Sequence, residues 1–158
     1  MNEQGQVCYT FEAAIEMAVQ MEDEGFRHYL AAIRKVKNKG AKEILRDAAL
    51  DELVHKHELE KALLDGNMGG DAALNRPVPT MNLDYALAKK ELTPESDTRE
   101  ALAYAIHLEK GSIDFYTRMS QGCAGAPMAP VFDRLLADET RHLQSLEDLY
   151  EQHFLPEG

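Results

Sequence analysis

The feature that most constrains this chain is an internal repeat, because its second half can be placed on its first with a shift of 87 residues. The alignment needs no gap from Ala14 on Ala101 to Glu60 on Glu147. It superposes six identical polar pairs: Glu22 and Glu109, Tyr29 and Tyr116, Asp51 and Asp138, Glu52 and Glu139, His55 and His142, and Glu60 and Glu147. The repeat predicts two similar halves that keep their polar residues for a physical reason.

Each half has the apolar periodicity of two helices. The predicted helices cover about residues 10–37, 41–64, 97–122 and 127–154, within half-repeats 10–65 and 97–154. Helices of about 25 residues are about 37 Å long, so the crossover 66–96 can carry the chain back along the bundle. Two hairpins joined by one long crossover predict an all-α fold, a ferritin-like four-helix bundle that forms a single domain over residues 1–158.

Local signals refine these boundaries. Gly40 offers a left-handed cap in the first turn, and Asp97 with Glu100 resembles a capping box for the third helix. The crossover contains several glycines and prolines, and its one helical fragment is expected near residues 83–92.

Six polar residues fall on positions of the helical seams that should be apolar. They are Glu22, Glu52, His55, Glu109, Glu139 and His142. Buried carboxylates without partners are costly, and no lysine or arginine falls on these seams. Two divalent cations would neutralise four carboxylates, so the pattern predicts a two-metal site.

The position of these residues along the hairpins supports that site. Residues equidistant from a turn lie level, and Glu22 and Glu52 are centred on residue 37, in the first predicted turn. Glu109 and Glu139 are centred on residue 124, in the second. Each histidine follows its glutamate by three residues, which places the pair on one helix face.

Charge and composition exclude several functions. The formal net charge of −11 argues against nucleic acid and anionic membranes as partners, and no apolar run is long enough to cross a membrane. The first nine residues lack the features of a signal peptide, so we expect a cytoplasmic protein. Cys8 and Cys123 form no C-x-x-C motif; we expect them at the same end of the bundle as free thiols.

Three segments carry a resemblance to a known family. They are Ala14-Ile15-Glu16-Met17 with Glu22 and Tyr29, the run Ile106–Tyr116, and Ala137-Asp138-Glu139 with His142. In these the chain resembles the rubrerythrin-like branch of the ferritin-like, di-iron carboxylate superfamily, without the rubredoxin domain. The resemblance covers both hairpins.

The resemblance implies a role for each of the six polar residues. Glu22 and Glu109 would be terminal metal ligands, Glu52 and Glu139 would bridge the metals, and His55 and His142 would each give one nitrogen. Many members carry a further ligand glutamate one turn after the third-helix glutamate, where this chain has Ser112. An exchange of one iron between a histidine and that glutamate is therefore not expected here.

Residues around the ligands leave alternatives open. Tyr29 and Tyr116 could donate hydrogen bonds to ligand carboxylates or simply fill the core. Asp51 and Asp138 could each orient the histidine of the opposite half, or lie on a solvated face. The remaining histidines, His28, His57, His107 and His153, are expected on the surface.

A carboxylate-rich site with one imidazole per ion suits two iron ions, with manganese or zinc as alternatives. The family resemblance implies a non-haem di-iron oxidoreductase that reduces hydrogen peroxide, or dioxygen, with electrons from an external donor protein. The alternatives are a ferroxidase or iron-storage protein and a structural di-metal bundle. We expect a homodimer or a larger homo-oligomer.

Overall fold

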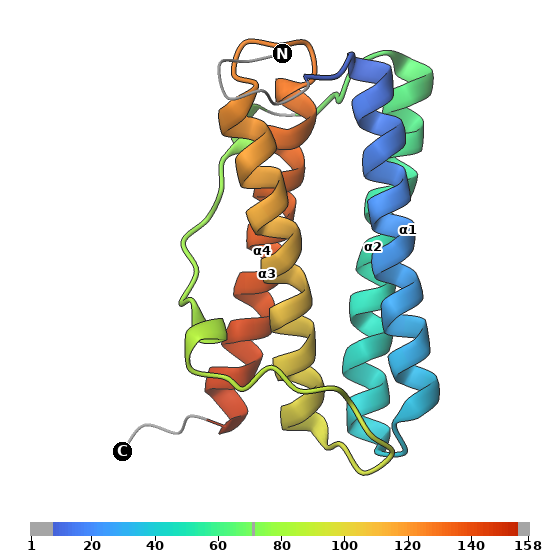
Figure 1. Ribbon diagram of the computed structural model, residues 1–158, viewed down its shortest axis with the longest axis vertical. Coiled ribbons are helices and arrows are strands. Elements are labelled where there is room, and N and C mark those ends of the chain that lie inside the picture. Colours follow the sequence, from blue (N-terminus) through green and yellow to red (C-terminus); the bar gives the residue numbers. More distant parts are fainter. Residues whose placement is uncertain (1–7, 71, 155–158) are drawn as a thin grey trace.

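Polar side chains fix where three of the four long helices begin. In the computed structural model, which describes residues 8–70 and 72–154, Thr10, Asn38 and Asp97 are N-caps whose side chains accept from the amides of Ala13, Ala41 and Glu100. The helices they start, with the fourth, are α1 Phe11–Lys35, α2 Lys39–Asp65, α3 Thr98–Gly122 and α4 Ala129–Phe154. These bounds confirm the predicted all-α bundle (Figure 1).

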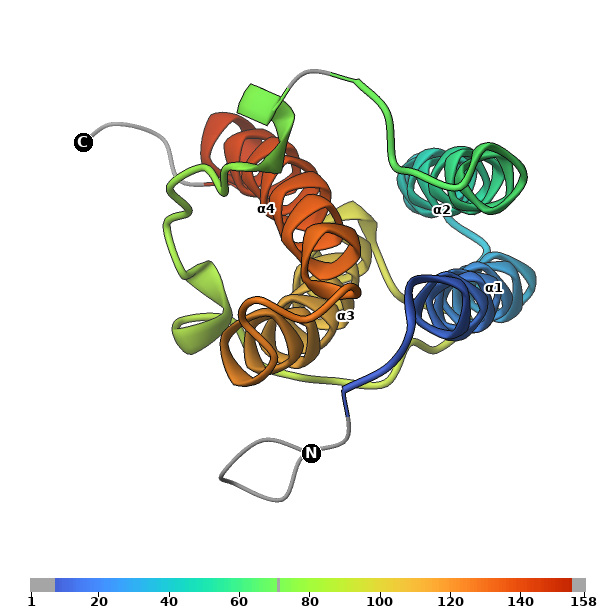
Figure 2. The same cartoon turned by 90° about the horizontal axis from the view of Figure 1, so that it is seen from above.

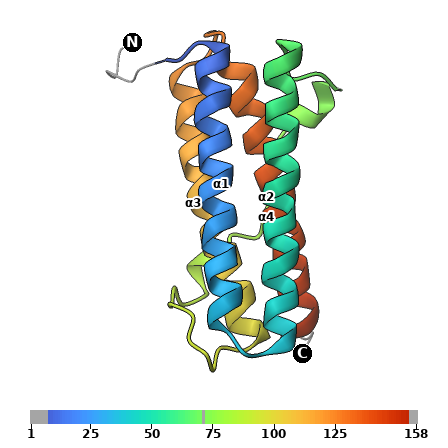
Figure 3. The same cartoon turned by 90° about the vertical axis from the view of Figure 1, so that its right-hand side faces the viewer.

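The helices form two antiparallel hairpins that lie side by side. One hairpin is α1 with α2 and the other is α3 with α4 (Figure 2). Helix α2 also packs against α3. The helix axes are nearly aligned, and α1 begins at the end of the bundle where α3 finishes (Figure 3). None of the helices in the described ranges has the length and apolar character needed to cross a membrane.

The core is divided into two apolar clusters, one toward each end of the bundle. One cluster contains Leu45, Leu102 and Leu143, and the other contains Ile15, Leu59 and Phe132. The predicted polar seam positions fall between them along α1, α2 and α4, and on α3 Glu109 lies between Ile106 and Ile113 of the first cluster. The bundle therefore holds a polar layer between two apolar clusters, which separate this layer from the solvent at either end of the bundle.

The crossover runs along the outside of α4 and is anchored there by hydrogen bonds (Figure 1). The two carboxylate oxygens of Glu147, a fully buried side chain, accept from the amides of Met81 and Leu83 at 2.8 and 2.9 Å. Thr140 accepts from the amide of Val78, and Gln144 donates to the carbonyl of Pro79. The crossover thus covers one face of the second hairpin.

Two local predictions were wrong. Gly40 is the second residue of α2 rather than a left-handed cap, and a Cβ there would lie 2.7 Å from Thr98 Oγ1, so glycine allows this close approach. Among its described residues, 66–70 and 72–96, the crossover is helical only at two short 3-10 turns, Ala72–Asn75 (η1) and Leu83–Tyr85 (η2), and not over 83–92. Past η2 the carbonyl of Leu87 meets the ring of His107 at 2.8 Å instead of a helical amide.

The cysteines lie at the same end of the bundle, as predicted, but they are not free thiols. Cys8 and Cys123 form a disulfide that joins the segment before α1 to the turn after α3. The amide of Tyr9 also donates to the sulfur of Met128 at 2.8 Å, which holds that segment against the turn. The prediction of free thiols rested on a reducing compartment, and the compartment itself stays a prediction.

Reduction of this disulfide should lower the free energy of unfolding by about 4–5 kcal/mol, because the bond closes a loop of 115 residues and restricts the unfolded chain. Urea unfolding with and without reductant measures the difference. The double variant Cys8→Ser/Cys123→Ser, which cannot form the disulfide, should unfold at the same urea concentration with and without reductant. Equal unfolding midpoints for the oxidised and reduced chain would contradict the expectation.

Candidate metal centre

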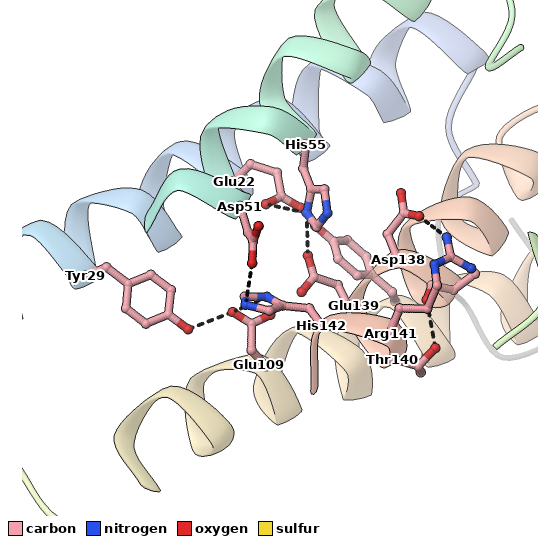
Figure 4. Close-up of polar contacts among 12 residues, drawn as sticks. Glu22, Tyr29, Asp51, His55, Glu109, Asp138, Glu139, Thr140, Arg141 and His142 are labelled. Atoms are coloured by element: carbon pink, nitrogen blue, oxygen red, sulfur yellow. Dashed lines mark hydrogen bonds and ion pairs between the residues drawn. The ribbon is translucent and has the colours of Figure 1, made fainter. Parts of the chain in front are cut away.

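The four helices bring the six predicted polar residues into one layer inside the bundle. All of them except Glu52 are labelled in Figure 4. Glu22 comes from α1, Glu52 and His55 from α2, Glu109 from α3, and Glu139 and His142 from α4. The four carboxylates are buried, between 1% and 6% exposed. Donor atoms fall into two groups whose members all lie within 4.8 Å of one another: Glu52, Glu109, Glu139 and His142, and Glu22, His55 and Glu139.

The ring nitrogens that face the layer are both Nδ1. His55 Nδ1 lies 3.3 Å from Glu139 Oε1 and 3.6 Å from Glu22 Oε2. His142 Nδ1 lies 3.3 Å from Glu109 Oε1. Glu139 belongs to both donor groups, so its carboxylate has the position from which it could bridge two ions.

Several buried atoms of this layer have no hydrogen-bond partner in the described part of the chain. They are Glu22 Oε2, His55 Nδ1, Glu109 Oε2, Glu139 Oε2 and His142 Nδ1. Buried polar atoms without partners are costly, and native proteins rarely keep them without a ligand or another compensation. Oxygen and imidazole donors that face one another without bonding are the arrangement expected around divalent cations, so the residues fit a metal site.

The buried layer also shifts the proton affinities of its carboxyl groups. Burial raises the pKa of Glu139 well above its usual range, and the charges of Glu109 and Glu22 raise it further. Burial and the neighbouring carboxyl group of Glu22 likewise raise the pKa of Glu52. Both groups therefore hold a proton when no metal is bound.

The other two carboxylates remain ionised. Burial opposes ionisation of Glu109, but the charge of His142 and the nearby carboxyl group of Glu139 lower its pKa overall. Burial likewise opposes ionisation of Glu22, and its close neighbours Glu52 and His55 lower its pKa. These contacts leave two negative charges in the layer.

The two histidines balance those charges. Burial lowers the pKa of His55, yet Glu139 and Glu22 raise it to about 11. The pKa of His142 is raised to about 10 despite burial, chiefly by the charge of Glu109 and by Asp51. Together these pKa shifts imply a metal-free layer of two imidazolium ions, two carboxylates and two neutral carboxylic acids, which is neutral overall.

Both tyrosines on the seam reach carboxylates of the opposite hairpin. The hydroxyl of Tyr29 donates to Glu109 Oε1 at 2.7 Å, and that of Tyr116 lies 3.5 Å from Glu22 Oε1. Burial and the nearby carboxylates raise the pKa of both phenols, so they stay protonated donors. Hydrogen bonding to a carboxylate therefore describes Tyr29 better than core filling alone.

The two aspartates differ. Asp51 Oδ2 lies 2.9 Å from His142 Nε2, the contact expected across the hairpins, although the Asp51 side chain is 51% exposed. Asp138 does not orient His55: it pairs instead with Arg141 of its own helix. The sequence repeat aligns the two aspartates, so it predicted the same contact for both and did not indicate this difference.

One residue was missed in the sequence and another was placed wrongly, because the crossover could not be positioned. Glu147, aligned with the exposed Glu60, is fully buried and binds crossover amides. His107, expected on the surface, is half-buried against the crossover. A carboxylate at a seam-adjacent position of α4 was the only available signal for Glu147.

Gly25, one turn after Glu22, makes room for Glu52. A Cβ at Gly25 would lie 3.0 Å from Glu52 Oε2, so the variant Gly25→Ala should displace this carboxylate and weaken metal binding at least about tenfold. The metal-free variant should be more stable by about 0.5–1 kcal/mol, because alanine favours helix over glycine. Metal titration and urea unfolding measure the two effects.

The control is Ser112→Ala, at the position the repeat aligns with Gly25. It adds no atom and should keep the affinity of the unmodified chain. Tighter metal binding by Gly25→Ala would contradict the assigned role.

A buried layer of four carboxylates and two imidazoles, on two hairpins joined by a long crossover, places this chain in the class of ferritin-like carboxylate bundles. A comparison with protein families narrows the class: the family described as Rubrerythrin matches residues 13–150, and the chain belongs to that family. Comparisons with curated proteins and with solved structures found no match.

Proposed function

We propose that this layer holds two iron ions and that the chain reduces hydrogen peroxide with electrons from a separate protein. The observation that carries the proposal is the set of buried, unpartnered donor atoms on Glu22, His55, Glu109, Glu139 and His142. Carboxylates tolerate both ferrous and ferric ions, which suits a redox site. Glu139 would bridge the ions, Glu52 lies in the His142 group, and each histidine would serve one ion.

Two bound ferrous ions would supply the two electrons that, with two protons, convert one molecule of hydrogen peroxide to two of water. The residues of the chain would control access to the ions and orient their ligands. Two apolar clusters close the layer from either end and limit access to small molecules. The Tyr29 hydroxyl holds Glu109 in place through its hydrogen bond.

These 158 residues contain no C-x-x-C motif from which a rubredoxin-type centre could be built, so the proposal gives the reduction of the oxidised site to an external donor. We propose a rubredoxin-like or flavoprotein donor. We also propose a homodimer or larger homo-oligomer, which the exposed Leu50, Leu53 and Val54 on the outer face of α2 support.

The reduced protein should react faster with hydrogen peroxide than with dioxygen. The test is anaerobic loading with Fe(II), followed by separate challenge with each oxidant while iron oxidation is recorded optically. Turnover should then depend on an added donor protein. If dioxygen oxidises the site faster and iron beyond two ions per chain is retained, the protein is a ferroxidase or storage protein instead.

A further inference from the structure

The two histidines of the layer are supported differently on the ring side that faces away from it. His142 Nε2 meets Asp51 Oδ2 at 2.9 Å, so both nitrogens of this ring have a defined neighbour (Figure 4). Within residues 8–70 and 72–154, the ion pairs of His55 are with Glu22 and Glu139 only, both through Nδ1. The aspartate that would support His55 by the repeat is Asp138, which points to Arg141 (Figure 4).

The cause of this difference lies three residues after each aspartate. The first half has Val54, an exposed apolar residue, where the second half has Arg141. Arg141 pairs with Asp138 through Nη2 and donates through Nη1 to the carbonyl of Leu74 at 3.1 Å. Leu74 belongs to η1, so the crossover helps to hold the arginine that engages Asp138.

The carboxylates repeat the same asymmetry. Glu109, next to His142, accepts a 2.7 Å hydrogen bond from Tyr29, whereas Tyr116 is 3.5 Å from Glu22, next to His55. The donor group of His142 has four members, all buried; that of His55 has three, and its histidine is only partly buried. The His142 group is therefore the better organised of the two.

We infer that the two metal positions are inequivalent: the His142 position binds its ion first and tightly, and the His55 position holds a weaker, exchangeable ion because Arg141 keeps Asp138 from orienting His55. This inference rests on the proposed two-metal site. A carboxylate that fixes the tautomer and orientation of a ligand histidine is typically worth 10–100-fold in metal affinity. We therefore expect the two binding steps to differ by about that factor.

The inference is tested by titrating the metal-free full chain with Co(II), whose visible absorption reports coordination, in competition with a chelator. Unmodified protein should bind two ions in two resolved steps. Asp51→Asn should weaken the tight step about 10–100-fold and bring the steps together. Its matched variant Asp138→Asn, at the equivalent position of the repeat, should leave both steps unchanged.

A third variant tests the role of Arg141 directly. Arg141→Val places the residue of the first half in the second, and frees Asp138 to reach His55. The weak step should tighten while the tight step stays the same, and adding Asp138→Asn should cancel the gain. Helical content by circular dichroism confirms that each variant is folded before it is titrated.

Two ions that bind with equal affinity, or equal losses in Asp51→Asn and Asp138→Asn, would overturn the inequivalence. If the two binding steps of Arg141→Val differ in affinity as much as those of the unmodified chain, the role of Arg141 would be overturned. These outcomes are separate from the proposed function, because cobalt binding requires no peroxide turnover. Failure to bind two cobalt ions at all would count against the two-metal site itself.

Discussion

Replacing Glu139 by glutamine should abolish high-affinity binding of at least one metal ion and leave the metal-free bundle folded. Glu139 is the residue shared by both donor groups, so its loss removes a donor from each. In the metal-free layer burial keeps its carboxyl protonated, and a glutamine side chain closely resembles that neutral form. Metal content after loading should fall from two ions per chain to one or none, while the free energy of unfolding changes by about 1 kcal/mol or less.

The control for this variant is Glu151→Gln, a change of the same kind on an exposed position of α4. It should bind two ions with the affinity of the unmodified chain. If Glu139→Gln still binds two ions tightly, the ions bind at a site that does not include Glu139. Elemental analysis of the loaded, desalted proteins decides between these outcomes.

Much of the fold could be predicted because the helices signal themselves locally. The capping box at Asp97 and the apolar periodicity set the predicted helix limits to within a few residues of those observed. The hairpin order also placed Cys8 and Cys123 at one end of the bundle. It could not show that the two sulfurs are bonded, since this depends on how the segment before α1 packs on the turn before α4.

The polar layer was predictable for a different reason. Carboxylates at buried seam positions contradict the hydrophobic pattern, and such contradictions concentrate at functional sites. The six residues meet as their spacing implied. That these residues bind metal ions, and that the metal is iron, are predictions that metal loading will test.

The departures from the repeat have one physical origin, which is the crossover. It lies along α4, so Glu147 and Arg141 bind crossover backbone, whereas the aligned residues of α2, Glu60 and Val54, face outward. A sequence repeat describes residues that both halves use alike. It carries no information about a segment that covers only one half.

Raising the pH from about 6 to about 8 should tighten binding of each metal ion by roughly 10⁴-fold, because the metal-free layer holds four protons that the ions must displace. Two of these protons are on His55 and His142, whose pKa values of about 11 and about 10 keep the rings charged in this range. The other two are on Glu52 and Glu139, whose pKa values burial raises.

The sign of this dependence follows from which groups titrate. Glu22 and Glu109 have lowered pKa values and are already ionised, so they release no proton on binding. The four groups with raised pKa values keep their protons across neutral pH, so each of two ions displaces about two protons and affinity rises about 100-fold per pH unit. Calorimetric titration in buffers of different ionisation enthalpy should count about four protons per chain, and the variant Ser112→Ala should give the same number. Release of fewer than about one proton per ion would mean that the metal-free layer is not the neutral array of two imidazolium ions, two carboxylates and two carboxylic acids.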